Sequence, residues 1–220
     1  VVVRRSMLRR PMPPHDRIAT RPAPGFEPRQ VLLFSGHRVD APDRPQPRFP
    51  PGQVAAAARR IDEALAHWHA GPQDLAITQG SAGGDLLLAV GLLAAAWGQE
   101  RGVPLQLMLP LPEAEFVRRA VAPSAEPARW RAAWSHVRAR LQLAPLLLPE
   151  AGGNPFERCN RWMLDTALGF GAARLRLICL WDGGDGDGPG GTDHLVAQAR
   201  RHGVPVTWID TRRLRSVNSA

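Results

Sequence analysis

Short apolar runs alternate along this chain with segments whose apolar residues recur at helical spacing. The strongest runs are VLLFSG at 31–36, DLAITQG at 74–80, PLQLMLPLP at 104–112 and LRLICLW at 175–181. Runs that are apolar on both faces are typical of parallel strands covered by helices on both sides. Because crossovers between parallel strands are right-handed, the pattern predicts a single doubly wound, Rossmann-like parallel sheet with helices on both faces.

The remaining elements follow from the same periodicity. Two further strands are expected at 144–150 and 204–210. Helices are expected at 53–70, 85 to about 100, 113–121, 128–141, 155–172 and 192–202. The helix at 128–141 places an apolar stripe on one face, formed by Trp130, Ala133, Trp134, Val137 and Leu141. This stripe predicts a helix packed on the core, with a dimer face as the alternative.

The net charge of +8 is carried by the ends of the chain, and all 28 basic residues are arginine. Residues 1–30 hold seven arginines against two acidic residues, and 211–220 hold three against none. The stretch 31–210 carries 18 of each sign, so it has no net attraction for a phosphate backbone. We therefore expect nucleic acid to be contacted only through the basic ends.

Three parts of the chain are expected. Residues 1–30 form an Arg- and Pro-rich extension that is either disordered or an over-extended reading frame, with a true start at Met7 or Met12. Residues 31–210 form one Rossmannoid domain, and 211–220 form a flexible basic tail.

The composition also indicates a compartment. No apolar run reaches the roughly 18 residues that a membrane span requires, which predicts that the chain has no membrane partner. Two cysteines, Cys159 and Cys179, lie far apart and do not form a disulfide framework. We expect a cytoplasmic protein. The sequence does not decide whether it forms a homo-oligomer.

Chemistry is expected in the loops that follow the strands, because ligands of doubly wound folds bind beyond the carboxyl ends of the strands. One such loop is Ser35-Gly36-His37-Arg38, and another runs from Gly80 through Ser81, Gly83 and Gly84 to Asp85. The loop after 175–181 begins at Asp182 and ends at Gly190, Gly191 and Thr192.

Two of these loops are glycine-rich and lead directly into a helix. The first turn of a helix has unpaired N–H groups that suit an anion, and glycine lets a phosphate approach them closely. One such turn is often only a tight connection, but two in one parallel sheet favour a ligand cradle. The chain contains no lysine, which rules out the P-loop lysine. Asp182, Asp185 and Asp187 are interpreted as a solvated turn, and no metal site is expected.

Taken together, these motifs resemble the SLOG superfamily. They are FSGH at 34–37, QGSAGGD at 79–85, LPLPEAEF at 109–116 and WDGGDGDGPGGT at 181–192. The resemblance covers about 31–210 and is closest to SLOG-type sensor domains of bacterial signalling and conflict systems. It implies that the two glycine turns hold the phosphate and ribose of a nucleotide. These are Gly80, Ser81, Gly83 and Gly84 in one turn and Gly190, Gly191 and Thr192 in the other.

The same resemblance bears on catalysis. Lonely-guy phosphoribohydrolases of this superfamily carry PGGxGTxxE, whose glutamate helps to cleave the N-glycosidic bond. Here Leu195 stands third after the threonine, so the carboxylate is missing. Asp85 and Asp193 are the substitute candidates.

Three hypotheses follow from the sequence. The first is a nucleotide-binding sensor domain, in which Ser35, His37 and Arg38 contact base or ribose, with Glu115 and Asn160 at the rim of the pocket. The second is a nucleotide N-glycosidase of the lonely-guy or NAD-hydrolase type. The third is binding of single-stranded DNA through the arginine-rich ends. Beyond a nucleotide-type ligand, no cofactor is expected.

Overall fold

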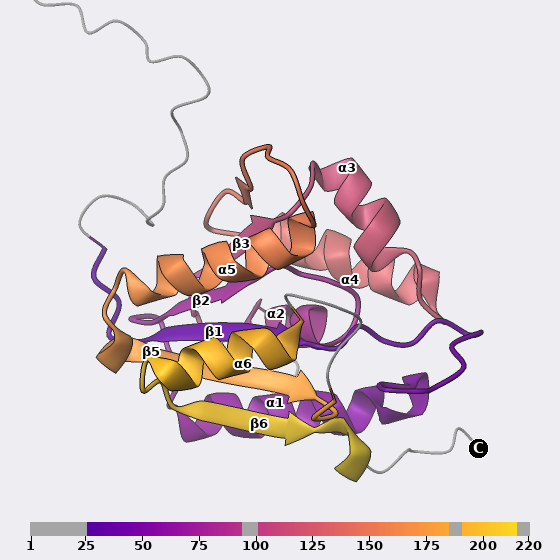
Figure 1. Ribbon diagram of the computed structural model, residues 1–220, viewed down its shortest axis with the longest axis horizontal. Helices are drawn as coiled ribbons and strands as arrows, with labels where there is room; N and C mark the ends of the chain where they lie inside the picture. The colour runs from indigo at the N-terminus through magenta and orange to yellow at the C-terminus, as the bar shows by residue number, and fades with distance from the viewer. Residues whose placement is uncertain (1–25, 94–100, 185–190, 215–220) are drawn as a thin grey trace, which may run out of the picture.

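The computed structural model describes residues 26–93, 101–184 and 191–214, and shows one parallel sheet between two layers of helices (Figure 1). The strands are β1 (Val31–Gly36), β2 (Leu75–Thr78), β3 (Leu105–Leu109), β4 (Leu146–Leu147), β5 (Leu175–Trp181) and β6 (Val206–Asp210). They pair in the order β4-β3-β2-β1-β5-β6, and every pair is parallel. The predicted α/β fold is confirmed.

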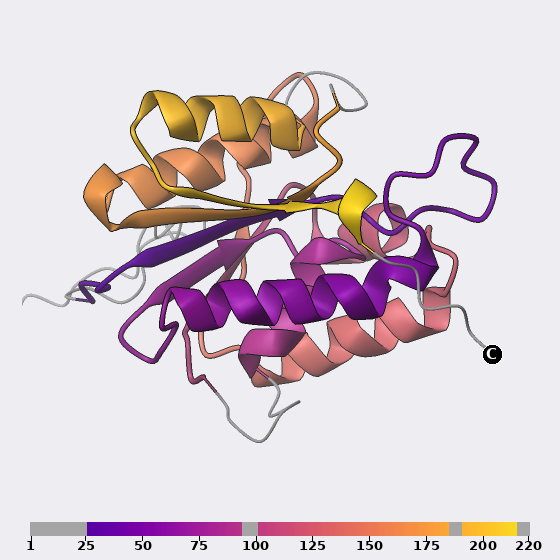
Figure 2. The ribbon, with the colours of Figure 1, turned by 90° about the horizontal axis from the view of Figure 1, so that it is seen from below.

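Helices cover both faces of the sheet (Figure 2). They are α1 (Val54–His67), α2 (Gly84–Leu93), α3 (Glu113–Phe116), α4 (Pro127–Arg140), α5 (Pro155–Leu168) and α6 (Thr192–Arg201). One apolar core lies between the sheet and α1, α2 and α4, and a second lies between the sheet and α5 and α6. Because each face has its own core, the inner strands are buried on both sides, as their continuous apolar sequences predict.

The sheet changes its winding direction at β1. The chain steps from β1 to β2, β3 and β4 with helices on one face, and it then returns to β5 on the other side of β1 with helices on the opposite face. The loops after β1 and β5 therefore leave neighbouring strands toward opposite faces. A crevice at such a switch point is where doubly wound folds bind ligands.

Two helices differ in detail from the sequence prediction. The described part of α2 ends at Leu93, and the predicted continuation to about residue 100 lies outside the described residues. The helix expected at 113–121 begins as α3 and continues as the π-helical turn Val117–Val121. Helix α4 does use its tryptophan face for the core, since Trp130 and Trp134 are buried.

Both ends of the described chain pack against the body. Arg29 N–H donates to the Gln73 carbonyl, and the Arg29 guanidinium donates to Asp74 at 2.8 and 2.9 Å. At the other end Thr211 is buried and opens a helical turn, Thr211–Arg213. Residues 26–30 and 211–214, which the sequence analysis grouped with the extension and the tail, thus contact the domain. Among the described residues, no helix combines the length and the apolar character that crossing a bilayer needs.

Candidate functional site

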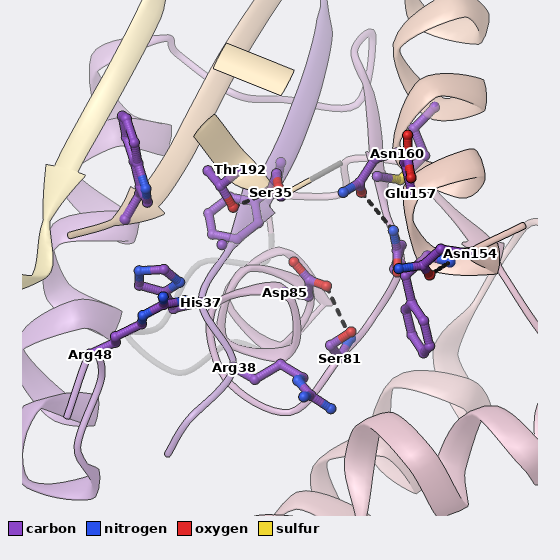
Figure 3. A pocket seen from close by; sticks show the side chains of 17 residues that line it. Ser35, His37, Arg38, Arg48, Ser81, Asp85, Asn154, Glu157, Asn160 and Thr192 are labelled. Carbon is purple, nitrogen blue, oxygen red and sulfur yellow. Dashed lines mark hydrogen bonds between the residues drawn. The ribbon is translucent and has the colours of Figure 1, made fainter. Parts of the chain in front are cut away.

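A cavity of about 300 Å³ opens at the carboxyl ends of β1, β2 and β5 (Figure 3). Its wall is formed by Phe34, Ser35, Gly36, His37, Arg38, Arg48, Gln79, Ser81, Asp85, Asn154, Phe156, Glu157, Asn160, Met163, Trp181, Gly191 and Thr192. These residues come from segments far apart in the sequence. The topology brings them together because the carboxyl ends of parallel strands share one edge of the sheet.

Many of the predicted site residues line this cavity, and others do not. Those in the wall are Ser35, Gly36, His37, Arg38, Ser81, Asp85, Asn160, Gly191 and Thr192. Those outside the wall are Gly80, Gly83, Gly84, Glu115, Asp182 and Asp193. Gly190, Asp185 and Asp187 lie outside the described residues.

The first strand and the last helix meet through two hydroxyl groups. Ser35 Oγ at the end of β1 lies 3.1 Å from Thr192 Oγ1 in the first turn of α6. Gly191 is the N-cap residue of α6 and adopts φ −66°, so its backbone is accessible to any residue. The N–H groups of a first helical turn have no acceptor within the helix and suit an anion. The start of α6 therefore presents such N–H groups to the cavity.

The glycine turn before α2 has a different explanation from the one that the sequence suggests. Gly83 has φ +125°, and a Cβ there would lie 2.6 Å from both the His37 carbonyl oxygen and the Val39 nitrogen. Gly84 N–H donates to the His37 carbonyl at 3.1 Å, and a Cβ on Gly84 would lie 2.9 Å from the Phe34 ring. The residues that approach this backbone so closely are thus those of β1 and its following loop. Here the glycines serve packing.

Asp85 is the buried acidic residue of the cavity. It lies in the first turn of α2, is 6 % exposed, and its Oδ2 accepts a hydrogen bond from Ser81 N–H at 3.1 Å. Burial raises the pKa of Asp85 to about 7, against hydrogen bonds from Ser81 and the Thr78 hydroxyl that lower it. The group is therefore divided between its neutral and ionised forms near neutral pH.

On the opposite side of the cavity, His37 is fixed by Asp182. Asp182 N–H donates to His37 Nε2 at 3.1 Å, and Asp182 Oδ1 lies 3.0 Å from the same nitrogen. Burial lowers the pKa of His37 in spite of this carboxylate. For Asp182, burial alone would raise the pKa, but the Gly184 N–H and the neighbouring His37 and Arg48 lower it overall. Asp182 thus lies behind His37 and orients it, while His37 lines the cavity as a neutral imidazole.

Arg48 is a cavity residue that the sequence reasoning missed. It lies in the proline-rich loop 41–52, and its Nε is 3.7 Å from Asp182 Oδ2. The buried Asp40 holds this loop in place by accepting hydrogen bonds from the backbone N–H groups of Arg48 and Phe49, each at 2.9 Å. The sequence does contain a signal for this arginine, because it lies in a proline-rich loop that follows an acidic residue. That pattern does not show which way the loop folds.

The wall formed by α5 was also largely missed. Asn154 caps the helix by accepting a hydrogen bond from Phe156 N–H at 3.0 Å, and the Asn160 amide oxygen accepts one from Gln79 at 2.6 Å. Phe156 offers an aromatic surface beneath the Arg119 guanidinium, which lies 5.7 Å from the ring centre. The sequence pattern Asn-Pro-Phe-Glu marks this helix start, but it does not show that the helix crosses the switch point.

A search of protein-family models with this sequence gave no match, and a search of curated proteins gave none either.

The cavity wall suits a ligand that combines an anion with a planar, partly polar group. Arg38, Arg48 and the α6 start suit an anion, whereas Phe34, Phe156 and Trp181 provide apolar surface. Among the described residues, no group of three or more His, Cys, Asp or Glu side chains could hold a metal ion. Leu195 is buried in the core beneath α6, so this position contributes packing and no carboxylate.

Proposed function

We propose that this chain binds a nucleotide or a nucleotide-derived ligand in the cavity at the switch point, as a SLOG-type sensor or binding domain. One observation carries the proposal: the Ser35–Thr192 contact places the start of α6 in the wall of the same cavity as Arg38, Arg48 and three aromatic rings. In this arrangement the phosphate lies against Gly191 and Thr192, and the base lies against the apolar wall.

The proposal is tested by calorimetric titration of the full chain with AMP, ATP, NAD and ADP-ribose. A melting screen selects the probes, because a ligand that binds the folded state raises its apparent stability. Binding of at least one probe supports the proposal, and binding of none contradicts it.

The variant Gly191→Val tests the position of the ligand. The backbone of Gly191, at φ −66°, accepts valine, so we expect the fold to persist while affinity falls at least tenfold as the side chain fills the cavity wall. The matched control is Gly71→Val, at the opposite edge of the sheet, where the nearest atom to a new Cβ is 3.8 Å away. Equal affinities of the two variants would place the ligand elsewhere.

One observation favours a second candidate function. Asp85 is a buried carboxyl group in the cavity whose pKa is about 7, which suits a general acid that protonates a departing base. A nucleotide N-glycosidase would add water across the N-glycosidic bond and release the free base. Chromatography of each binding mixture detects that base, and the Asp85→Asn variant should abolish its release. Probe binding without any base would exclude this candidate.

A further inference from the structure

We propose that Asp85 determines the orientation and class of ligand: it accepts a hydrogen bond from an amino or hydroxyl group and excludes a phosphate from the turn before α2. The inference rests on the proposed function, since it concerns the same cavity. It departs from the expectation that both glycine turns hold the phosphate and ribose in the same way.

The position of Asp85 gives it access to the ligand. Figure 3 shows its side chain projecting into the middle of the cavity, with Ser81 on one side and Ser35 and Thr192 on the other. Its Oδ2 receives the Ser81 N–H, and the Ser81 hydroxyl and the Gly80 N–H are further donors from the same turn. The carboxylate is therefore both fixed by its own turn and placed where a bound molecule contacts it.

The start of α2 offers little to a phosphate. Ser81 N–H is bonded to Asp85, Ala82 N–H donates to the Ala120 carbonyl at 2.9 Å, and Gly84 N–H donates to the His37 carbonyl. Three of the N–H groups that would form a phosphate cradle thus already have acceptors in the protein. The positive end of the helix instead faces a carboxylate that belongs to the chain.

No arginine or histidine forms an ion pair with Asp85 in the part of the chain that the structure describes. Arg48 lies against Asp182, and Arg38 donates to the Arg119 carbonyl at 3.0 Å. Cys159 on α5 lies close enough to Asp85 to be affected by its charge, and the other titratable side chains of the wall are Glu157, His37, Arg38 and Arg48. Burial raises the pKa of Cys159 and lowers that of His37, so both are neutral at pH 8. A phosphate beside Asp85 would therefore meet a carboxylate that has no ion-pair partner among the described residues.

The two ends of the cavity therefore differ in chemistry. The α6 end presents N–H groups and the Thr192 hydroxyl, with its first-turn carboxylate Asp193 outside the wall, whereas the α2 end presents a carboxylate acceptor inside it. A ligand fits both when it carries a phosphate at one end and hydrogen-bond donors, such as ribose hydroxyls or an exocyclic amine, at the other. The pH dependence has a definite sign: the ionised carboxylate accepts such a donor, so binding strengthens as pH rises past the pKa of Asp85, which is about 7.

The experiment compares wild type, Asp85→Asn and Thr192→Val by calorimetry, with AMP and inorganic phosphate as probes at pH 6 and pH 8. For Asp85→Asn we expect AMP affinity to fall at least tenfold at pH 8 and less at pH 6, whereas phosphate affinity stays the same or rises, because the repelling charge is gone. Thr192→Val, the matched control at the other end, should weaken both probes at both pH values. The phosphate of AMP itself changes its protonation between pH 6 and pH 8. This change is the same for all three proteins, so comparing their affinities at one pH cancels its effect.

Distinct outcomes overturn each proposal. If wild type binds AMP and Asp85→Asn binds it equally well at pH 8, or binds phosphate more weakly, the inference about Asp85 fails and the proposed function stands. If wild type binds neither probe, both fail. Circular dichroism checks that Asp85→Asn is folded. If it is not, adenosine, which has no phosphate, replaces it as the probe: its affinity for wild type must rise between pH 6 and pH 8, and a constant affinity overturns the inference.

Discussion

Burial of Asp85 at the start of α2 lowers the stability of the folded protein when the carboxyl group is ionised. Its pKa is raised from 3.8 to about 7 by burial, so the folded state binds a proton more tightly than the unfolded chain. Stability therefore declines as pH rises from about 4 to about 7, and three pKa units correspond to about 4 kcal/mol. We expect Asp85→Asn to be more stable than wild type at pH 8 by as much as about 4 kcal/mol, with the gap closing toward pH 4.

Urea denaturation of both proteins at pH 4.5, 6 and 8 measures this gap. A gap that does not change with pH would show that Asp85 titrates normally in the folded protein.

Gly83 and Gly91 lie eight residues apart but have opposite roles. Gly83 has φ +125° and touches the backbone of the loop after β1, whereas a Cβ on Gly91 would meet only a side-chain carbon of Leu65 at 4.0 Å. We expect Gly83→Ala to cost roughly 2–4 kcal/mol through strain and overlap. Gly91→Ala should stabilise α2 by about 0.5–1 kcal/mol.

Urea unfolding of the two variants at one pH gives both numbers. If both variants changed the free energy of unfolding equally, the contact between the turn before α2 and the loop after β1 would not require glycine at Gly83.

At the scale of elements, the segment before β1 is joined to the start of β2 by one carboxylate. The Asp74 side chain is fully buried and accepts hydrogen bonds from the Arg29 guanidinium, the Gln30 amide and the Gly71 N–H. Burial alone would raise its pKa, but these donors lower the pKa below 3.8. The ionised group therefore stabilises the fold above pH 3.8, and this contribution is lost as pH falls through the folded pKa.

We expect Asp74→Asn to lower the free energy of unfolding by about 2–3 kcal/mol at pH 7 and by less below pH 3. The reason is that the substitution replaces hydrogen bonds to a charged carboxylate with weaker ones to a neutral amide. Asp62→Asn is the control, since Asp62 is 41 % exposed in its pair with Arg101 and should cost less than about 1 kcal/mol. The urea unfolding midpoints of wild type and both variants at pH 7 and pH 3 measure these costs. A cost for Asp74→Asn no larger than that of the control would show that the segment is not held by this group.

Elements were predictable from the sequence where periodicity determines them. The buried strands and amphipathic helices α1 and α5 follow from apolar spacing, and the loops at the strand ends follow from the fold class. Arg48, Asn154 and Phe156 were not predictable as site residues, because periodicity shows where an element ends but not which side chains face a crevice between elements. The packing of the glycines before α2 was not predictable for a related reason: their sequence is the same whether a phosphate or another loop approaches the backbone.

At the scale of the whole molecule, the winding reversal at β1 decides where a ligand can bind, and the charge distribution decides what else the chain can contact. The winding brings the start of α6, Asp85 and the loop after β1 to one cavity. The arginine excess lies mainly elsewhere: residues 1–25 carry six arginines and one acidic residue. Binding of a small nucleotide and binding of a polyanion should therefore be separable.

We expect any affinity of the full chain for single-stranded DNA to be lost when residues 1–25 and 215–220 are removed, while AMP affinity is kept. Polyanion binding scales with the number of phosphates neutralised, and the retained stretch 26–214 carries 21 arginines against 19 acidic residues, which is nearly balanced. Fluorescence anisotropy with a labelled oligonucleotide at 50 and 200 mM salt measures the affinity and its salt slope for both chains. A truncated chain that kept the DNA affinity and the slope would place the contacts on the folded body, with the exposed Arg118 and Arg119 on the π-helical turn as the first residues to mutate.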